Sequence, residues 1–169
     1  MTKSYLWKLG VAGIVEATQS GARSATDIVE AAIKRMDQVN PALNAVVMDL
    51  SDQARQRAAD LDRARARGAA LGPLHGVPIT IKVNVDQAGW ATTNGVTALE
   101  NLVAASDAPV VRNLQNAGAV VIGRTNTPEF SFRAETDNEL HGRTRNPWGD
   151  HISPGGSSGG AGAAVMAGI

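Results

Sequence analysis

The chain has 169 residues, of which 43% are hydrophobic and 19% are charged, values typical of a globular protein with one sizeable core. Its 16 basic residues balance 16 acidic residues, so the charge gives no sign of binding to nucleic acid or to anionic membranes. Cysteine is absent, which excludes disulfide bonds and thiolate chemistry. With no apolar leader and no run near the ~18 apolar residues of a membrane span, we expect a cytoplasmic protein.

Residues 1–70 are predicted to be a mainly helical lead-in. Apolar residues at helical spacing indicate a helix over 5–20, and the capping side chains at 24–27 begin another helix. We expect Asn40–Pro41 to end that helix, because a residue before proline avoids the α conformation. Residues 43–48 then predict a short strand. The alternating charges of 51–67 are typical of a solvated helix with its alanines inward rather than of a nucleic-acid surface.

Residues 71–169 are predicted to hold the sheet. The continuous apolar run at 77–85 indicates a strand buried on both faces, with Lys82 in its middle. Residues 107–118 predict a capped helix that ends in glycine, and 119–123 a second buried strand. This succession of strand, helix and strand is typical of an α/β domain, and we treat residues 1–169 as part of one such domain.

A glycine- and serine-rich loop over residues 153–162 is the most distinctive stretch of the chain. Its glycines let the backbone approach a ligand closely, and the small apolar residues after it predict a buried helix from 163 onward. A loop that opens such a helix offers free N–H groups and hydroxyls together. A flexible linker is the alternative, but linkers seldom lead straight into an apolar helix.

The buried lysine and the loop serines together suggest acyl-transfer chemistry. A serine hydroxyl is a weak nucleophile until a base removes its proton, and lysine can be that base only when its pKa is lowered. Burial lowers it, and Lys82 is expected to be buried. The histidines His75, His141 and His151 have no metal-ligand spacing and are expected at the surface, so no metal is predicted.

Two other motifs fit the glycine loop less well. Residues 155–159 formally match the G-x-S-x-G nucleophile elbow, but that motif needs a strand directly before it, and residues 150–154 predict a loop. A phosphate-binding loop needs a Gly-Lys-Ser/Thr ending, and the lysine is missing here.

Four blocks in order make the chain recognisable: HGVPITIKVN at 75–84, GAVVIGRTNTPEF at 118–130, NPW at 146–148 and PGGSSGGA at 154–161. Together they resemble the amidase signature family over most of the chain from about residue 73 onward. The resemblance implies an α/β fold with a mixed β-sheet core surrounded by helices. It also implies hydrolysis of carboxylic amides by a Ser-cisSer-Lys triad, without metal or cofactor.

The resemblance assigns roles to particular residues. Lys82 matches the neutral base, and Ser157 matches the bridging serine, whose peptide bond is cis in the family. Ser158 would be a supporting hydrogen-bond partner, while Gly155 and Gly156 would support the loop. The acyl-accepting serine belongs to a further Gly-Gly-Ser block roughly two dozen residues beyond Ser157, which falls past the last residue given.

We therefore expect an amidase acting on a small-molecule amide, with the polypeptide 1–169 alone inactive because it carries only two members of the triad. One departure is Val83, where relatives often place an aspartate. The alternatives are the A subunit of an aminoacyl-tRNA amidotransferase and an inactive fragment or binding module. The substrate is not predicted, although Trp90 and the aromatics at 130–132 hint at an apolar wall as readily as at ordinary packing. A homodimer is one assembly that the sequence allows.

Overall fold

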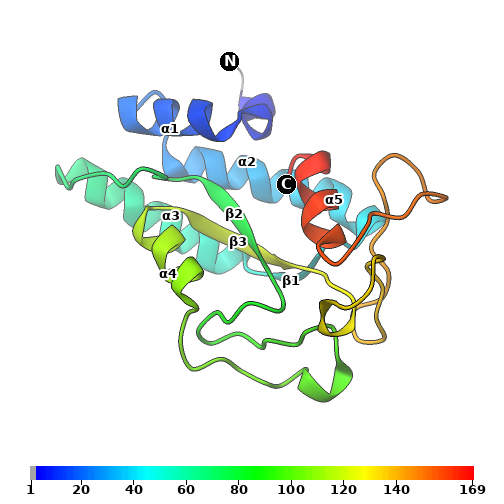
Figure 1. The fold of residues 1–169 in the computed structure, drawn as a ribbon. Coiled ribbons are helices and arrows are strands. Elements are labelled where there is room, and N and C mark those ends of the chain that lie inside the picture. The colour runs from blue at the N-terminus through cyan, green and yellow to red at the C-terminus, as the bar shows by residue number, and fades with distance from the viewer. Residues whose placement is uncertain (1–2) are drawn as a thin grey trace.

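The structure, a computed structural model, describes residues 3–169, with side chains from Tyr5 onward (Figure 1). The strands are β1 (Val46–Asp49), β2 (Pro78–Lys82) and β3 (Val120–Thr125). The α-helices are α1 (Val11–Ser20), α2 (Ala25–Leu43), α3 (Ser51–Ala66), α4 (Pro109–Asn116) and α5 (Gly159–Ala167). Short 3-10 helices are η1 (Lys3–Lys8), η2 (Thr97–Leu99) and η3 (Glu129–Ser131).

The three strands form one mixed sheet in the order β1-β3-β2. The central strand β3 runs parallel to β2 and antiparallel to β1, and all six of its residues are buried. Since β1 comes from the first 70 residues, the helical lead-in also contributes a strand to the sheet. The predicted α/β class, a mixed sheet surrounded by helices, is confirmed.

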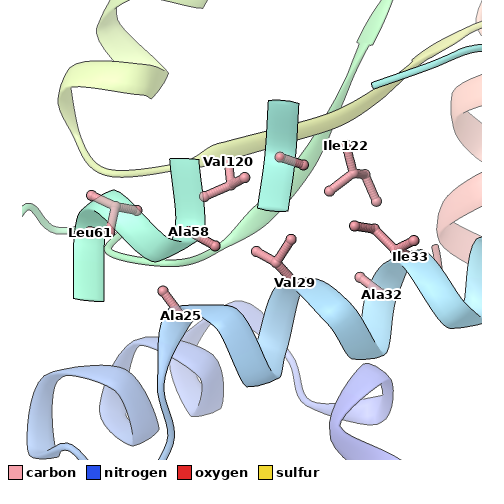
Figure 2. Close-up of a cluster of buried hydrophobic side chains, with 9 residues drawn as sticks. Ala25, Val29, Ala32, Ile33, Ala58, Leu61, Val120 and Ile122 are labelled. Carbon is pink, nitrogen blue, oxygen red and sulfur yellow. The ribbon is translucent and has the colours of Figure 1, made fainter. Parts of the chain in front are cut away.

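Helices cover both faces of this sheet. Figure 2 shows Val29 and Ile33 of α2, Ala58 and Leu61 of α3, and the β3 side chains Val120 and Ile122 turned toward one another. Because side chains alternate along a strand, Val121 points the other way, where it packs with Val111 of α4. The burial of these apolar side chains fixes β3 between two helical layers.

The start of α2 agrees with the sequence, but its end does not. Ser24 Oγ accepts a hydrogen bond from the Asp27 backbone N–H at 2.9 Å and begins the helix as predicted. The helix then continues through Pro41 to Leu43, so the expected stop at Asn40–Pro41 is wrong. Proline deprives only the carbonyl four residues earlier of a partner, and that residue, Asp37, is exposed to water. The helix ends instead at Asn44, which adopts a left-handed conformation with φ 51°.

Other boundaries also differ from those expected. The helix predicted over 5–20 is divided into η1 and α1, because Gly10 is extended and serves as the N-cap of α1. Asp107 does not cap α4; its carboxylate accepts from the Ala88 N–H at 2.7 Å and ties down a loop instead. The strand predicted over 77–85 is shorter and mostly half-buried, because β2 lies at an edge of the three-stranded sheet. Lys82 is therefore the last residue of its strand rather than a residue in its middle.

The helix after the glycine loop begins at Gly159, earlier than the predicted residue 163. It lies beside α2 (Figure 1), and its alanines Ala163 and Ala164 belong to a buried cluster with Leu43 of α2. Its outer side is open, with Val165 74% exposed, so the expectation of a buried helix holds for one side only. Over residues 3–169, none of the helices has the length and apolar character needed to cross a membrane.

Candidate active site

The sheet explains why distant residues meet at one place. The strands β2 and β3 are parallel, with Lys82 paired to Thr125 at their carboxyl ends. Loops that follow parallel strands emerge at the same edge of a sheet, which is where α/β proteins place their sites. The segments after Lys82 and after Thr125 therefore lie beside each other, and the glycine loop before α5 joins them.

Lys82 contacts both serines of the glycine loop. Its Nζ lies 2.9 Å from Ser157 Oγ and 3.2 Å from Ser158 Oγ, although Lys82 and Ser157 are 75 residues apart in the sequence. Ser157 is half-buried and Ser158 is exposed. The structure thus brings together the three side chains that the sequence singled out.

Burial changes the proton affinity of Lys82. Its side chain is half-buried, and removal of water from the ammonium lowers the pKa of the amine. Within residues 3–169, no carboxylate forms an ion pair with Lys82 that would oppose this change. An amine in these surroundings loses its proton more easily than one at the surface, which suits it to act as a base.

The backbone before Ser157 requires glycine at both Gly155 and Gly156. Gly155 has φ 82°, in the left-handed region that favours glycine, and a Cβ on Gly156 would lie 2.4 Å from the Arg133 carbonyl oxygen. The peptide bond between Gly156 and Ser157 is cis. Thr136 holds this part of the loop: its hydroxyl donates to the Gly155 carbonyl at 3.0 Å and accepts from the Gly159 N–H at 3.0 Å.

Three polar side chains that the sequence analysis did not single out lie behind Ser157. The Thr127 hydroxyl is 3.1 Å from the Ser157 carbonyl oxygen and 2.9 Å from Ser131 Oγ. Asn84 Nδ2 donates to Ser131 Oγ at 3.2 Å. Asn84 itself lies in the turn after β2.

Comparison with known proteins identifies the family. A family model described as Amidase matches residues 27–169. The chain belongs to the amidase signature family. This confirms the resemblance on which the sequence analysis relied.

Individual relatives agree with that assignment. An indoleacetamide hydrolase from Bradyrhizobium diazoefficiens is 59% identical over 167 residues, which are 99% of this chain and 32% of that protein. The A subunit of a glutamyl-tRNA(Gln) amidotransferase from Synechococcus is 44% identical over 150 residues, which are 89% of this chain and 30% of that protein. The structure of a bacterial aryl acylamidase matches with a TM-score of 0.89 at 37% identity, over 93% of this chain and 33% of that one. The 169 residues thus span about a third of the length of these relatives.

Arg124 is a further residue of this amidase segment that the sequence analysis did not single out. It lies on β3 with 0% of its surface exposed, and it donates to three backbone carbonyls, one at the end of β2 and two in the segment after it. Its Nη1 lies 2.7 Å from the Ala91 oxygen, and its Nη2 lies 2.6 Å from that of Val85 and 3.4 Å from that of Lys82. Burial lowers the pKa of Arg124 to about 10, so it remains charged at neutral pH. Arg124 therefore anchors the end of β2, where Lys82 lies, and the segment that follows it.

Two of the three histidines of the amidase segment do not lie at the surface as expected. His151 is exposed, but His75 is only 2% exposed and His141 is half-buried, with its Nε2 3.0 Å from Thr93 Oγ1. His75 is buried because the loop before β2 packs closely against Gly118, where a Cβ would lie 2.9 Å from the His75 Cα. No cluster of metal-ligating side chains occurs in the part of the chain that the structure describes.

The aromatic residues near the site are of two kinds. Trp90 packs on the buried cluster around Val111, and its indole N–H donates to Gln53 at 3.2 Å, so it has a structural role. Phe130 and Phe132 are 55% and 89% exposed. Exposed aromatics on the loop that carries Ser131 are consistent with the apolar wall suggested by the sequence.

Proposed function

We propose that this protein hydrolyses the C–N bond of a carboxylic amide, giving an acid and ammonia or an amine through an acyl-serine intermediate. The observation that carries the proposal is the 2.9 Å contact between Lys82 Nζ and Ser157 Oγ, at a lysine whose pKa burial lowers. An amine that loses its proton readily beside a hydroxyl suits general-base activation of a serine. Likeness to enzymes named as amide hydrolases supports the same reaction.

In this proposal, Lys82 and Ser157 move protons and a further serine forms the covalent bond. Neutral Lys82 accepts the Ser157 hydroxyl proton while Ser157 accepts the proton of the acyl-accepting serine, whose oxygen attacks the amide carbon. The returning proton leaves Lys82 through Ser157 and reaches the nitrogen, so that the C–N bond breaks and the amine departs. Water then repeats the sequence on the acyl ester and releases the acid. Ser158 supports Lys82 as a second hydrogen-bond partner at 3.2 Å.

The test uses a polypeptide of the relatives' full length that contains these residues, referred to below as the full-length protein. Indoleacetamide is the first substrate to try, because the 59% identical relative is named for its hydrolysis. Release of ammonia is expected, and Lys82→Ala should reduce it by about 10²–10⁴-fold, the usual contribution of a general base. Lys34→Ala removes an exposed lysine of α2 and is the matched control. Full activity of Lys82→Ala would refute the proposed role of Lys82.

For the polypeptide 1–169 alone, we propose that no acyl-enzyme forms, because the family's acyl-accepting serine lies beyond these residues. A mass-verified sample should release no ammonia from any linear amide. Turnover by that sample, abolished by Lys82→Ala, would show that the nucleophile is present within it. A role as a binding module would then lose its main support.

The amidotransferase interpretation is the second candidate, because the A subunit of such an enzyme is 44% identical over 89% of the chain. The two interpretations differ in their need for partners. Hydrolysis of simple amides by the isolated full-length protein supports the amidase, whereas activity that appears only with further subunits and a charged tRNA supports the amidotransferase. The higher identity to a hydrolase leads us to favour the amidase.

The proposed function also includes a substrate class, an oligomeric state and a location. The substrate is a small linear amide, with neither nucleic acid nor a membrane required and no cofactor involved. A homodimer and a cytoplasmic location stay proposals, which sedimentation and cell fractionation of the full-length protein would test.

A further inference from the structure

Behind Ser157, a row of polar side chains links the two segments that follow the parallel strands β2 and β3 to the glycine loop. Asn84 comes from the turn after β2, Thr127 from the segment after β3, and Ser131 from the end of η3. The row runs from Asn84 Nδ2 to Ser131 Oγ at 3.2 Å, from Ser131 Oγ to Thr127 Oγ1 at 2.9 Å, and from Thr127 Oγ1 to the Ser157 carbonyl oxygen at 3.1 Å. It therefore ends on the backbone of the residue that contacts Lys82.

The hydrogen bonds of this row can have only one direction. A carbonyl oxygen only accepts, so the single hydroxyl proton of Thr127 is donated to Ser157. Ser131 must then donate its own proton to Thr127, and Ser131 Oγ is left to accept from the Asn84 amide. Bonds arranged head to tail in this way polarise one another, so each strengthens the next.

The surroundings hold Thr127 and Ser131 firmly in place. Thr127 is 0% exposed, and its carbonyl accepts from Asn138 Nδ2 at 2.7 Å. Phe130 and Ser131 have φ values of 48° and 62°, a left-handed conformation that is uncommon for residues with a Cβ. The Phe130 N–H donates to the Asn94 carbonyl at 2.9 Å, which helps to keep the turn in this shape. Backbone held in such a conformation is often found where a side chain must be aimed at a functional site.

We propose that Asn84, Ser131 and Thr127 are positioning residues that act in series on Ser157 and so set its alignment with Lys82. Thr127 is the member that touches Ser157, while Ser131 acts through Thr127 and Asn84 through Ser131. The inference rests on the proposed function, in which Ser157 relays the proton to Lys82. It extends that function by naming the residues that hold the relay in place.

The series arrangement predicts a specific pattern of rates in the full-length protein. Thr127→Val keeps the size of the side chain and removes its hydroxyl, and should lower kcat by about 10- to 100-fold, as small misplacements of reacting groups do. KM should change less than about twofold, because none of the three residues touches the substrate in the proposal. Ser131→Ala should lower kcat less, by about three- to tenfold.

The double variant distinguishes a series from independent contacts. If Ser131 acts only through Thr127, Thr127→Val/Ser131→Ala should be no slower than Thr127→Val alone. Thr127→Ser keeps the hydroxyl and should retain at least half of the wild-type kcat. Losses that multiply in the double variant, or an inactive Thr127→Ser, would overturn the proposal.

Thr125→Val is the matched control for removal of a buried hydroxyl. Thr125 is also 0% exposed, two residues before Thr127, but its Oγ1 has no hydrogen-bond partner within residues 3–169. Its replacement should leave kcat unchanged and should not lower the thermal midpoint, because the buried hydroxyl that it removes has no partner to lose. If Thr125→Val reduces kcat as much as Thr127→Val, the loss reflects packing at this edge of the sheet, and the proposal is refuted.

A measurement independent of activity separates this inference from the proposed function. The Ser157 carbonyl and the Ser158 N–H belong to one peptide group, so a weaker bond to the carbonyl should move the Ser158 amide proton resonance upfield. The full-length protein labelled with ¹⁵N-serine should show a large shift in Thr127→Val, a smaller one in Ser131→Ala, and none beyond that of Thr127→Val in the double variant. If the variants show this pattern of shifts but the wild type does not hydrolyse amides, the proposed function is refuted, while the proposal that the three residues act in series on Ser157 stands. Hydrolysis by the wild type with an unshifted Ser158 resonance in Thr127→Val would overturn the series alone.

Discussion

Lys82 has the surroundings that the proposed chemistry requires of a base. Its backbone is held by β3 at the end of β2, while its side chain reaches the two serines of the glycine loop. The next residue, Val83, is 0% exposed and fills the core, so it adds no carboxylate beside the amine. Burial therefore lowers the pKa of Lys82 without an adjacent acid to raise it again.

The pH dependence of catalysis follows from this environment. In the proposed mechanism Lys82 acts only when neutral, so kcat of the full-length protein should fall tenfold for each unit of pH below the lowered pKa of Lys82. Activity should therefore be highest on the alkaline side and be lost as the pH decreases. Lys82→Arg keeps the positive charge but cannot give up its proton, and it should be inactive throughout. Turnover by Lys82→Arg, measured as ammonia release from about pH 5 to about pH 10, would contradict a base role.

Arg124 is a second residue for which we can predict an effect, in this case on the free energy of unfolding. Arg124→Met removes a buried guanidinium from three backbone carbonyls. The Lys82 carbonyl keeps the Val85 N–H at 3.0 Å, whereas those of Ala91 and Val85 each cost about 1–3 kcal/mol when buried without a donor. Relief from burying the charge offsets part of this loss, so we expect a decrease of about 3 kcal/mol in the free energy of unfolding.

Denaturant unfolding of Arg124→Met and Arg124→Lys measures this contribution. Arg124→Lys retains a cation that can donate to some of the carbonyls and should lose less stability. Arg112→Met, on the exposed side of α4, is the control and should change stability by no more than about 0.5 kcal/mol. Equal stability of Arg124→Met and the wild type would show that water replaces the guanidinium.

At the scale of elements, local signals predicted some helix boundaries, while tertiary contacts decided others. Ser24 begins α2 as expected, because an N-cap bond involves residues three apart. Asp107 has an equally suitable side chain, but its carboxylate binds the distant Ala88 N–H. Pro41 does not end α2, because Asp37, whose carbonyl it leaves without its helical partner, is an exposed residue. Such outcomes depend on what lies beside the element, which no local pattern contains.

The start of α2 has a second cap that comes from another helix. Asp62 of α3 accepts from the N–H groups of Ala25 at 2.7 Å and Thr26 at 3.0 Å, and from the Thr26 hydroxyl at 2.6 Å. A carboxylate at a helix N-terminus satisfies free N–H groups and interacts favourably with the helix dipole. Asp62 thus joins α2 to α3 at one end of their contact.

Asp62→Ala should lower the free energy of unfolding by about 1–2 kcal/mol, because it leaves two N–H groups at the start of α2 without an acceptor. Asp60→Ala is the matched control on the same helix. Asp60 pairs with Arg63 on the surface, and exposed pairs of this kind contribute about 0–1 kcal/mol. Urea unfolding at neutral pH should rank the two variants in this order, and equal losses would contradict a capping role for Asp62.

At the scale of the whole molecule, the sequence predicted the residues that contact each other in the candidate site but not the residues that hold them in place. Lys82 and Ser157 stood out because lysine is unusual within an apolar run and because the glycine loop has a distinctive composition. Thr127 and Arg124 did not, since both bind backbone carbonyls of other segments. Any residue supplies such a carbonyl, so these contacts leave no pattern in the sequence. They follow only from the parallel pairing of β2 and β3, which brings the loops together.

His75 lies where several parts of the molecule join. Its carbonyl accepts from the Thr18 hydroxyl of α1 at 2.8 Å, and its Cα packs against Gly118 in the turn before β3. Its side chain is buried, and within residues 3–169 its Nε2 has no hydrogen-bond partner. Burial is the main cause that lowers the pKa of His75, and the field of Asp62 opposes it only in part.

The fold should therefore lose stability in mild acid through His75. Its pKa is lower in the folded chain than in the unfolded chain, where it is about 6.5, so the unfolded chain takes up the proton first. The contribution of the neutral imidazole is complete above that pH and is lost as the pH falls toward the folded-state pKa, by about 1.4 kcal/mol for each unit of lowering. His75→Gln cannot titrate, and its free energy of unfolding should change less than that of the wild type between about pH 7.5 and about pH 5.5. The exposed His151→Gln should behave as the wild type does, and identical pH slopes for all three proteins would show that His75 is not the group responsible.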